Sequence, residues 1–396
     1  TGGTLNVGSG AHSAIAGGYQ NTSGQFFSFV GGGYGNNASG YYNVIGGGQS
    51  NSGTAVGQVT TQTATTNSTT TVTLDASNAS IKVGQVVTGT NISTNTYVTA
   101  ISSTTLTISQ VASGSGATNL FFWTPHGVVV GGGNNQATGA YSFIGGGGDA
   151  GTASNRNTAS GDWSFVGGGR KNVASGAGSI IVGGGSEGTN TFGNTASGQI
   201  SAIVGGWNHT ASGYGSFIGG GSTHTANATF STVVGGALGT VRGISGNIVF
   251  PACNIPIAGT AGTSQSSVLI LGRQTTDATP TALTSDTNAA GTTNQIILPN
   301  NSAYFVRGTI IAGVTGGGNT SAWDFKGAIK RGANAASTAL VSAITANMVA
   351  QDAGASTWAV AITADTTNGG LKVTVTGQAA TTIRWVCEIE TTEMTY

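Results

Sequence analysis

A short apolar step followed by glycines returns along most of this chain, and no other feature constrains its fold as strongly. The steps begin at Ile15, Val30, Ile45, Val130, Ile144, Val166, Val182, Val204, Ile218 and Val234. Most are followed by two or three glycines and then by a segment of the form Asn-x-Ala-Ser-Gly. An internal period of about 14 to 16 residues indicates one small structural unit stacked many times.

Composition favours a folded, β-rich chain. Glycine supplies 70 of 396 residues, but only five are proline and the glycines follow no three-residue period, so disorder and collagen are excluded. Charged residues make up 6% of the chain and the formal net charge is zero, which argues against binding to nucleic acid or anionic membranes. No apolar run approaches the roughly 20 residues of a membrane span, so we predict no membrane insertion.

The period breaks once, and the composition changes once, which predicts four segments. Residues 1–54 are a first block of repeats, 55–126 a small inserted β-domain, and 127–250 a second block of repeats. Residues 251–396 are expected to form an antiparallel β-sandwich, because apolar residues alternate along its segments and the charged side chains concentrate there. One short helix is expected within 334–349. Because Thr1 is no initiator, the chain is expected to be a fragment or a processed product.

Two adjacent apolar residues precede most glycine corners. Adjacent residues on a strand point to opposite faces, so both faces of this strand are apolar. One face can fill the interior of a roll, and the other needs a second surface, which we expect other copies of the chain to supply. The ladder residues, at the roll core or at a subunit interface, are Phe29, Val30, Phe143, Ile144, Phe165, Val166, Phe217 and Ile218.

The pairing of Ser142-Phe143-Ile144-Gly145 with Asn157-Thr158-Ala159-Ser160-Gly161 resembles the head repeats of YadA-type trimeric autotransporter adhesins. The resemblance covers somewhat under half of the chain and implies a trimeric parallel β-roll. A repetitive trunk followed by a β-rich end also resembles tail-fibre and receptor-binding proteins of tailed bacteriophages. That resemblance implies a homotrimer in the virion tail, outside the cell, with other phage tail proteins and a host-surface glycan or protein receptor as partners.

From these features the main expectation is a non-enzymatic phage tail fibre that attaches to host cells through residues 251–396. It would have no catalytic residues, no cofactor and no metal. The alternative is a bacterial trimeric surface adhesin or extracellular filament subunit on the cell surface. A lesser alternative is a tailspike glycan depolymerase, for which Asp149 and Glu187, both in long loops, are the least unfavourable pair of carboxylates.

Several other residues are candidates for binding or for the core. Tyr19, Tyr34, Trp207 and Tyr214 lie beside glycine corners and are expected to be exposed, where they could contact a receptor. Trp323, Trp358 and Trp385 are in register with aliphatic residues and are expected in the core. The histidines, His12, His126, His209 and His224, are isolated and are expected in exposed loops. Cys253 and Cys387 are expected to be buried free thiols.

Overall fold

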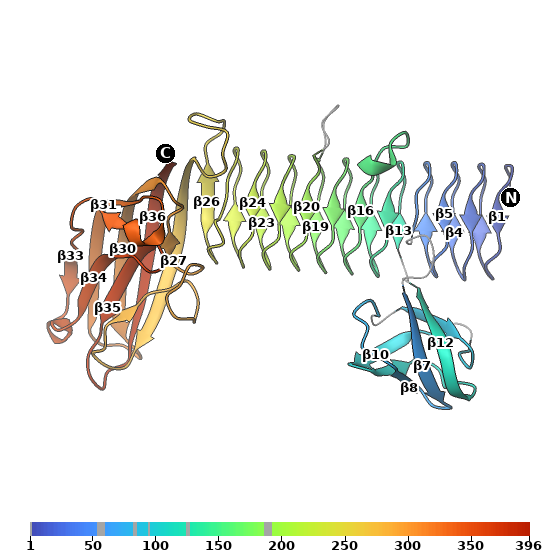
Figure 1. Cartoon of the computed structure of the whole chain (residues 1–396), viewed down its shortest axis with the longest axis horizontal. Coiled ribbons are helices and arrows are strands. Elements are labelled where there is room, and N and C mark those ends of the chain that lie inside the picture. Colours follow the sequence, from blue (N-terminus) through green and yellow to red (C-terminus); the bar gives the residue numbers. More distant parts are fainter. Residues whose placement is uncertain (1, 54–59, 82–84, 94–95, 124–126, 186–191) are drawn as a thin grey trace. The chain divides into compact units, whose positions relative to one another are not determined.

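The chain is all-β in the computed structural model, which describes residues 2–53, 60–81, 85–93, 96–123, 127–185 and 192–396 (Figure 1). The helices among these residues are three short 3-10 turns, η1 (Ala153–Asn155), η2 (Ala335–Ser337) and η3 (Ala353–Ala355). None of the described helices is long and apolar enough to cross a membrane. The chain divides into two units, residues 1–200 and 201–396, which are described separately.

The first unit contains a parallel β-solenoid in which each coil contributes two short strands (Figure 1). One sheet contains β2 (Ala14–Ile15), β4 (Phe29–Val30), β6 (Val44–Ile45), β13 (Val128–Val129), β15 (Phe143–Ile144), β17 (Phe165–Val166) and β19 (Ile180–Ile181). The other contains β1 (Val7–Gly8), β3 (Thr22–Ser23), β5 (Asn37–Ala38), β14 (Gln136–Ala137), β16 (Thr158–Ala159), β18 (Val173–Ala174) and β20 (Thr195–Ala196). Neighbouring coils pair in parallel in both sheets.

The solenoid interior is narrow and is filled by one aliphatic residue and one small residue from each coil. Val30, Ile144 and Val166 are fully buried in the first unit, and so are the alanines of the facing strands. The preceding aromatic residues point outward: Phe29 is 39% exposed, and Phe143 and Phe165 are half-buried and stack on each other at 5.3 Å between ring centroids. The predicted two-faced strand is therefore confirmed.

Some of the predicted steps were assigned one residue too late. Val130 and Val182 are each 52% exposed, whereas Val129 and Ile181 before them are fully buried. In the second unit, Val204 and Val234 are likewise exposed, and Ile203 and Val233 are buried. With the buried residue as reference, the spacing between paired coils is 15 residues from Val166 to Ile181, and 22 residues from Ile144 to Val166, where a loop is inserted.

A ladder of buried asparagines closes one corner of each coil. Asn36 donates from Nδ2 to the carbonyls of Gly32 and Gly48, both at 2.9 Å, and its Oδ1 accepts the backbone N–H of Asn51 at 3.0 Å. Each asparagine thus satisfies backbone groups of its own coil and of the next. The same contacts recur at Asn51, Asn135, Asn157 and Asn172.

The last glycine of a step takes the left-handed backbone conformation that the corner requires. Gly33 has φ +91°, and a Cβ atom at this position would lie 2.1 Å from the carbonyl oxygen of Gly48 in the next coil. No other residue fits such a position. The predicted role of these glycines as corners is confirmed.

The described residues between 60 and 123 contain an antiparallel sheet in the order β10-β11-β8-β7-β12-β9. Its strands are β7 (Thr60–Asn67), β8 (Thr71–Leu74), β9 (Val86–Gly89), β10 (Val98–Ser102), β11 (Thr105–Ile108) and β12 (Ser115–Trp123). A cluster that includes Val72, Leu106 and Leu120 forms its buried core.

The second unit begins with further coils and continues into two antiparallel sheets. The coil strands are β21 (Ala202–Ile203), β22 (Thr210–Ala211), β23 (Phe217–Ile218), β24 (Thr225–Ala226), β25 (Thr232–Val233) and β26 (Ile248–Pro251). Here Ile218 is fully buried and Phe217 is 38% exposed. Strand β26 pairs in parallel with β25 and antiparallel with β27, so it joins the solenoid to the first antiparallel sheet.

The first antiparallel sheet follows the order β27-β36-β30-β31, with β32 and β33 both paired to β31. These strands are β27 (Ser264–Thr275), β30 (Ser302–Val314), β31 (Thr320–Arg331), β32 (Ala339–Leu340), β33 (Asn347–Gln351) and β36 (Ile383–Thr395). The second sheet contains β28 (Thr281–Ala282), β29 (Ile296–Ile297), β34 (Ala359–Asp365) and β35 (Gly370–Thr376). Residues from both sheets share one hydrophobic core.

Two predictions for residues 251–396 can be compared with this unit. Trp323, Trp358 and Trp385 are at most 4% exposed, so their expected place in the core is confirmed. The expected helix within 334–349 is wrong: the regular structure in this segment is the three-residue turn η2, strand β32 and the first part of β33. Its alanines flank strands that pair with β31, and this pairing overrides their helix propensity.

Candidate functional site

Several charged side chains of the chain lie together on the outer face of the first antiparallel sheet. The sequence contains twelve lysines and arginines and twelve aspartates and glutamates. Five of these, Arg307, Asp324, Lys326, Glu388 and Glu390, line one open groove of about 370 Å³. The volume is within the range of small-ligand pockets. In so weakly charged a chain, this concentration makes the groove the candidate site.

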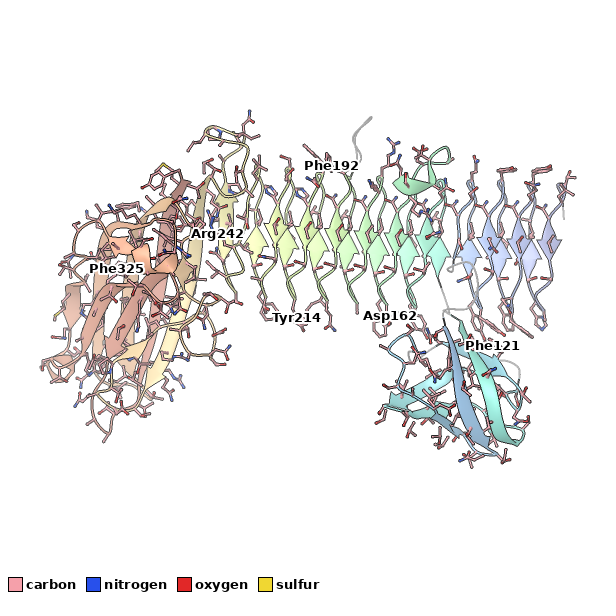
Figure 2. The ribbon with its side chains drawn as sticks, viewed as in Figure 1. Phe121, Asp162, Phe192, Tyr214, Arg242 and Phe325 are labelled. Carbon is pink, nitrogen blue, oxygen red and sulfur yellow. The ribbon has the colours of Figure 1, made fainter. Side chains whose placement is uncertain are left out.

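Strand alternation places these side chains outward. On β31, Trp323 and Phe325 point into the core, so Asp324 and Lys326 between and after them point out. On β36, Cys387 and Ile389 are buried, so Glu388 points out. Figure 2 labels Phe325 in this unit.

Two carboxylates lie on either side of the central strand of the groove. Thr309 on β30 is paired with Asp324 on β31 and with Glu388 on β36. Adjacent strands are about 4.8 Å apart, so the backbones of Asp324 and Glu388 are about 9 to 10 Å apart across Thr309. Their side chains project into the same groove, which Thr309 also lines.

Two residues along the strands on the same outer face lies a second row of paired residues, and this row contains the cations. Arg307 is paired with Lys326 on one side and with Glu390 on the other. The Arg307 guanidinium forms an ion pair with the Glu390 carboxylate. Asp324 accepts a hydrogen bond of 3.1 Å from Nδ2 of Asn347 on β33. No ion pair joins Asp324, Lys326 or Glu388 to another described residue.

The aromatic residues expected to be exposed are exposed, but the structure does not gather them into one described pocket. In the first unit Tyr19 and Tyr34 are 42% and 44% exposed, and their rings stack at 5.6 Å. In the second unit Trp207 and Tyr214 are 37% and 45% exposed. Tyr214 is labelled in Figure 2. Their role in receptor binding stays a prediction.

The expected acid pair is not supported at Asp149. This carboxylate forms an ion pair of 2.5 Å with Arg170 and accepts a hydrogen bond of 3.1 Å from Asn155. The bond from Asn155, followed by Arg170 and the Gly151 N–H, lowers the pKa of Asp149. Such a carboxylate is held by its own loop and stays ionised, so it is unsuited to donate a proton. Glu187 lies outside the described residues.

The expectation of exposed histidines is wrong for two of them. His209 and His224 are each 1% exposed and occupy ladder positions that asparagine holds in other coils. Nδ1 of His209 accepts the N–H of His224 at 3.1 Å, and Nδ1 of His224 accepts the N–H of Gly239 at 2.8 Å. His12 is exposed, as expected, and His126 is outside the described residues. No group of three or more potential metal ligands occurs among the residues described.

The cysteine prediction is half right. Cys387 is a buried free thiol, whose pKa burial raises, whereas Cys253 is free but exposed. The groove residues themselves are absent from the sequence predictions. Their only local signal is the alternation of Asp324 with Lys326, and of Glu388 with Glu390, on segments whose other residues alternate with core positions.

The solved structures that this chain matches include two phage tailspikes. No protein-family model and no curated protein matches the chain. One match is the tailspike protein of Acinetobacter baumannii phage AM24, at 10% identity and a TM-score of 0.19, covering 69% of this chain and 51% of that one. The other is a tailspike protein from Acinetobacter baumannii bacteriophage Fri1, described as a capsular polysaccharide depolymerase. It matches at 9% identity and a TM-score of 0.19, covering 96% of this chain and 80% of that one.

Against these matches, the prediction of a non-enzymatic adhesion fibre is wrong, and so is the prediction that the chain is no enzyme. The Fri1 protein is described as a depolymerase, which is the activity that the sequence analysis gave as its lesser alternative. The chain spans about half the length of the AM24 tailspike. A TM-score of 0.19 means that the backbones do not superimpose, so neither match assigns a residue or a reaction to this chain.

Proposed function

We propose that the chain is a subunit of a bacteriophage tailspike, in the virion tail, that binds and hydrolyses a host-surface polysaccharide in the groove of its second unit. The observation that carries the proposal is the placement of Asp324 and Glu388 on either side of Thr309. Glycoside hydrolysis needs two carboxyl groups that flank the scissile bond. These are two carboxylates of one groove whose separation is set by strand pairing and which are not held by an ion pair with another described residue.

The separation favours inversion at the anomeric carbon. The backbone spacing of about 9 to 10 Å, with both side chains pointing outward, is nearer to the carboxyl separation of inverting enzymes, about 6.5 to 9.5 Å, than to the about 5 Å of retaining ones. The wider separation lets a water fit between one carboxyl group and the sugar. The Asn347 amide donates to Asp324, which suits an ionised carboxylate that accepts a proton from this water. Glu388 would then donate a proton to the leaving glycosidic oxygen. The water oxygen bonds to the anomeric carbon as the glycosidic bond breaks, and the products are a new reducing end and an alcohol.

The test is hydrolysis of capsular polysaccharide from the bacterium that the phage infects. Asp324→Asn and Glu388→Gln should each lower the release of reducing ends by about 100-fold or more, because each removes a proton-transfer group. Asp277→Asn is the matched control, since Asp277 is an exposed carboxylate of the same unit outside the groove. If the wild type binds the polysaccharide and releases no reducing ends, or if both groove variants keep full activity, the assignment is wrong.

We further propose that the functional particle is a homotrimer whose chains pack through the solenoid. Two residues after the buried aliphatic residue, an added Cβ atom would meet nothing within 4 Å at five glycines of the first unit that have no positive φ: Gly47, Gly131, Gly146, Gly168 and Gly183. The equivalent glycines of the two earlier coils differ, because a Cβ on Gly17 would lie 3.5 Å from the Gly2 carbonyl oxygen and Gly32 has φ +156°. Nothing within the chain requires glycine there, although glycine loses more conformational freedom on folding than any other residue. Close approach of a neighbouring backbone would require it, and the adjoining exposed apolar residues, such as Phe29 and Val130, would then be buried.

Light scattering after size-exclusion chromatography tests the trimer. The wild type should have three times the chain mass of 38.7 kDa. Gly146→Val with Gly168→Val should dissociate it while leaving the chain folded, because the added side chains meet open space within one chain. A monomeric wild type, or a variant with unchanged mass, would contradict the interface.

A further inference from the structure

We infer that the polysaccharide bound in the groove is acidic, and that Lys326 and Arg307 hold the carboxylate of a uronic-acid-type sugar. The inference rests on the proposed function and concerns the class of its substrate. The observation behind it is the register of β30 and β31, which places Arg307 directly opposite Lys326 on the outer face of the sheet. Like charges directly opposite each other on one face of a sheet are destabilising.

Within the chain this pair of cations is only half compensated. Glu390 forms an ion pair with Arg307 from the far side of β30, whereas Lys326 forms no ion pair with a described residue. The other two acids of the groove are in the row of Thr309. Glu388 lies on β36, with Thr309 of β30 between it and β31, and Asp324 accepts a hydrogen bond from the Asn347 amide. An anion bound above Lys326 and Arg307 would relieve the repulsion between the two cations.

The placement of this pair fits a sugar that is bound beside the reacting bond. Lys326 follows Asp324 by two residues on the same face of β31, about 7 Å along the strand. The cations therefore lie one row away from the two carboxylates, in the same groove. A sugar carboxylate bound by Lys326 and Arg307 would orient the polysaccharide over Asp324 and Glu388. It would not occupy the position of the attacking water. Lysine and arginine donate charge-assisted hydrogen bonds, which discriminate strongly between an anionic sugar and a neutral one.

The experiment uses the full chain and an array of bacterial capsular polysaccharides that contain hexuronic acid. Each is presented in its native form and after its carboxyl groups have been reduced to alcohols with carbodiimide and borohydride. The wild type should bind the native forms at least about tenfold more tightly, and the preference should weaken as sodium chloride is raised. For a polysaccharide that is cleaved, KM should rise by a similar factor on reduction, with kcat changing less.

Lys326→Gln should remove most of this preference by weakening binding to the native polymer alone. Lys330→Gln is the matched control, because Lys330 lies on the same strand and the same face but does not line the groove. A purely structural role of Lys326 would weaken both forms equally, and that result would overturn the inference. Equal binding of native and reduced polymers by the wild type would also overturn it.

These outcomes are separate from failure of the proposed function. If reduced and native polymers are cleaved equally well, the acidic substrate is wrong and the hydrolase stands. If the native polymer is preferred in binding but no reducing ends are released, the acidic ligand stands and the hydrolase is wrong.

Discussion

The stacked histidines of the second unit should make the solenoid sensitive to acid at one defined place. His209 and His224 lie with ring centroids 4.9 Å apart and nearly parallel rings. Burial, and for His209 also the neighbouring His224, lowers the pKa of each ring from 6.5 to about 4. Each Nδ1 accepts a backbone N–H from the next coil, so a proton on Nδ1 would abolish that hydrogen bond.

The magnitude follows from the difference in proton affinity between the folded and unfolded chain. A tenfold change in proton affinity corresponds to about 1.4 kcal/mol. A pKa lowered from 6.5 to about 4 therefore means that each neutral ring contributes about 3 kcal/mol to the free energy of unfolding. Because the folded pKa is the lower one, the unfolded chain binds more protons between these values. The stabilisation is complete above pH 6.5 and is lost as the pH falls toward about 4.

Hydrogen exchange can locate this loss within a chain of several folded parts. As the pH falls from 7 to 4, the amides of His224 and Gly239 should lose protection relative to their intrinsic exchange rates. The amide of Asn172, which donates to Oδ1 of Asn157 at 3.0 Å, is an internal control in an asparagine coil. The double variant His209→Asn, His224→Asn should keep its protection at low pH, because asparagine fills the same position in other coils.

Three results would refute this reasoning. One is a ring pKa near 6.5, measured from selectively labelled histidine. Another is equal protection of the histidine and asparagine coils at pH 4. The third is an unchanged pH profile in the double variant.

Three other substitutions test the packing that holds the fold. Asn172→Ala removes the side-chain donors to the carbonyls of Gly168 and Gly184, both at 2.9 Å. It should lower the free energy of unfolding, measured by denaturant titration, by about 3 kcal/mol. The control, Thr210→Ala at an exposed position, should leave this free energy nearly unchanged. Glu393→Gln removes the buried carboxylate that lies 3.0 Å from the Arg242 guanidinium, whose side chain is 11% exposed. The free energy of unfolding should fall by about 3 to 5 kcal/mol, because the arginine charge is left unpaired. A fall below about 1 kcal/mol would show that water replaces the carboxylate as the partner of Arg242. Gly308→Ala puts a Cβ 2.4 Å from the Phe325 ring and should lower the melting temperature, whereas an unchanged melting curve would show that the ring moves freely.

The repeat, and which of its residues face inward, could largely be predicted from the sequence. Phe29 with Val30 illustrates why: an aromatic and an aliphatic residue side by side on a strand must face opposite ways, and the smaller one fits a narrow interior. The same reasoning failed at residues 128–130. Three valines follow one another there, so residue type does not show which of them faces inward. There the hydrogen-bonded register with β6 and β15 selects Val129 as the inner residue.

The histidine ladder could not be predicted from residue type, since an isolated histidine is usually exposed. Its place follows from position: His209 and His224 stand in the coil where asparagine stands elsewhere, and the imidazole Nδ1 can replace the amide oxygen as acceptor. When the repeats are aligned on the buried aliphatic residue, both histidines fall at the asparagine position. A correct alignment of the repeats would therefore have revealed that histidine replaces asparagine there.

The groove depends on pairing between strands that are distant in the sequence, and this is why composition alone did not reveal it. Asp324 and Glu388 become neighbours only because both strands pair with β30 at Thr309. This register is held from below, since a slip of one residue would bury both carboxylates and expose Phe325 and Cys387. The positions of the two carboxylates therefore derive their precision from the hydrophobic core beneath them. Substitutions in the groove should change binding and hydrolysis with little effect on stability, whereas Gly308→Ala, on the core side of the same strand, should disturb stability first.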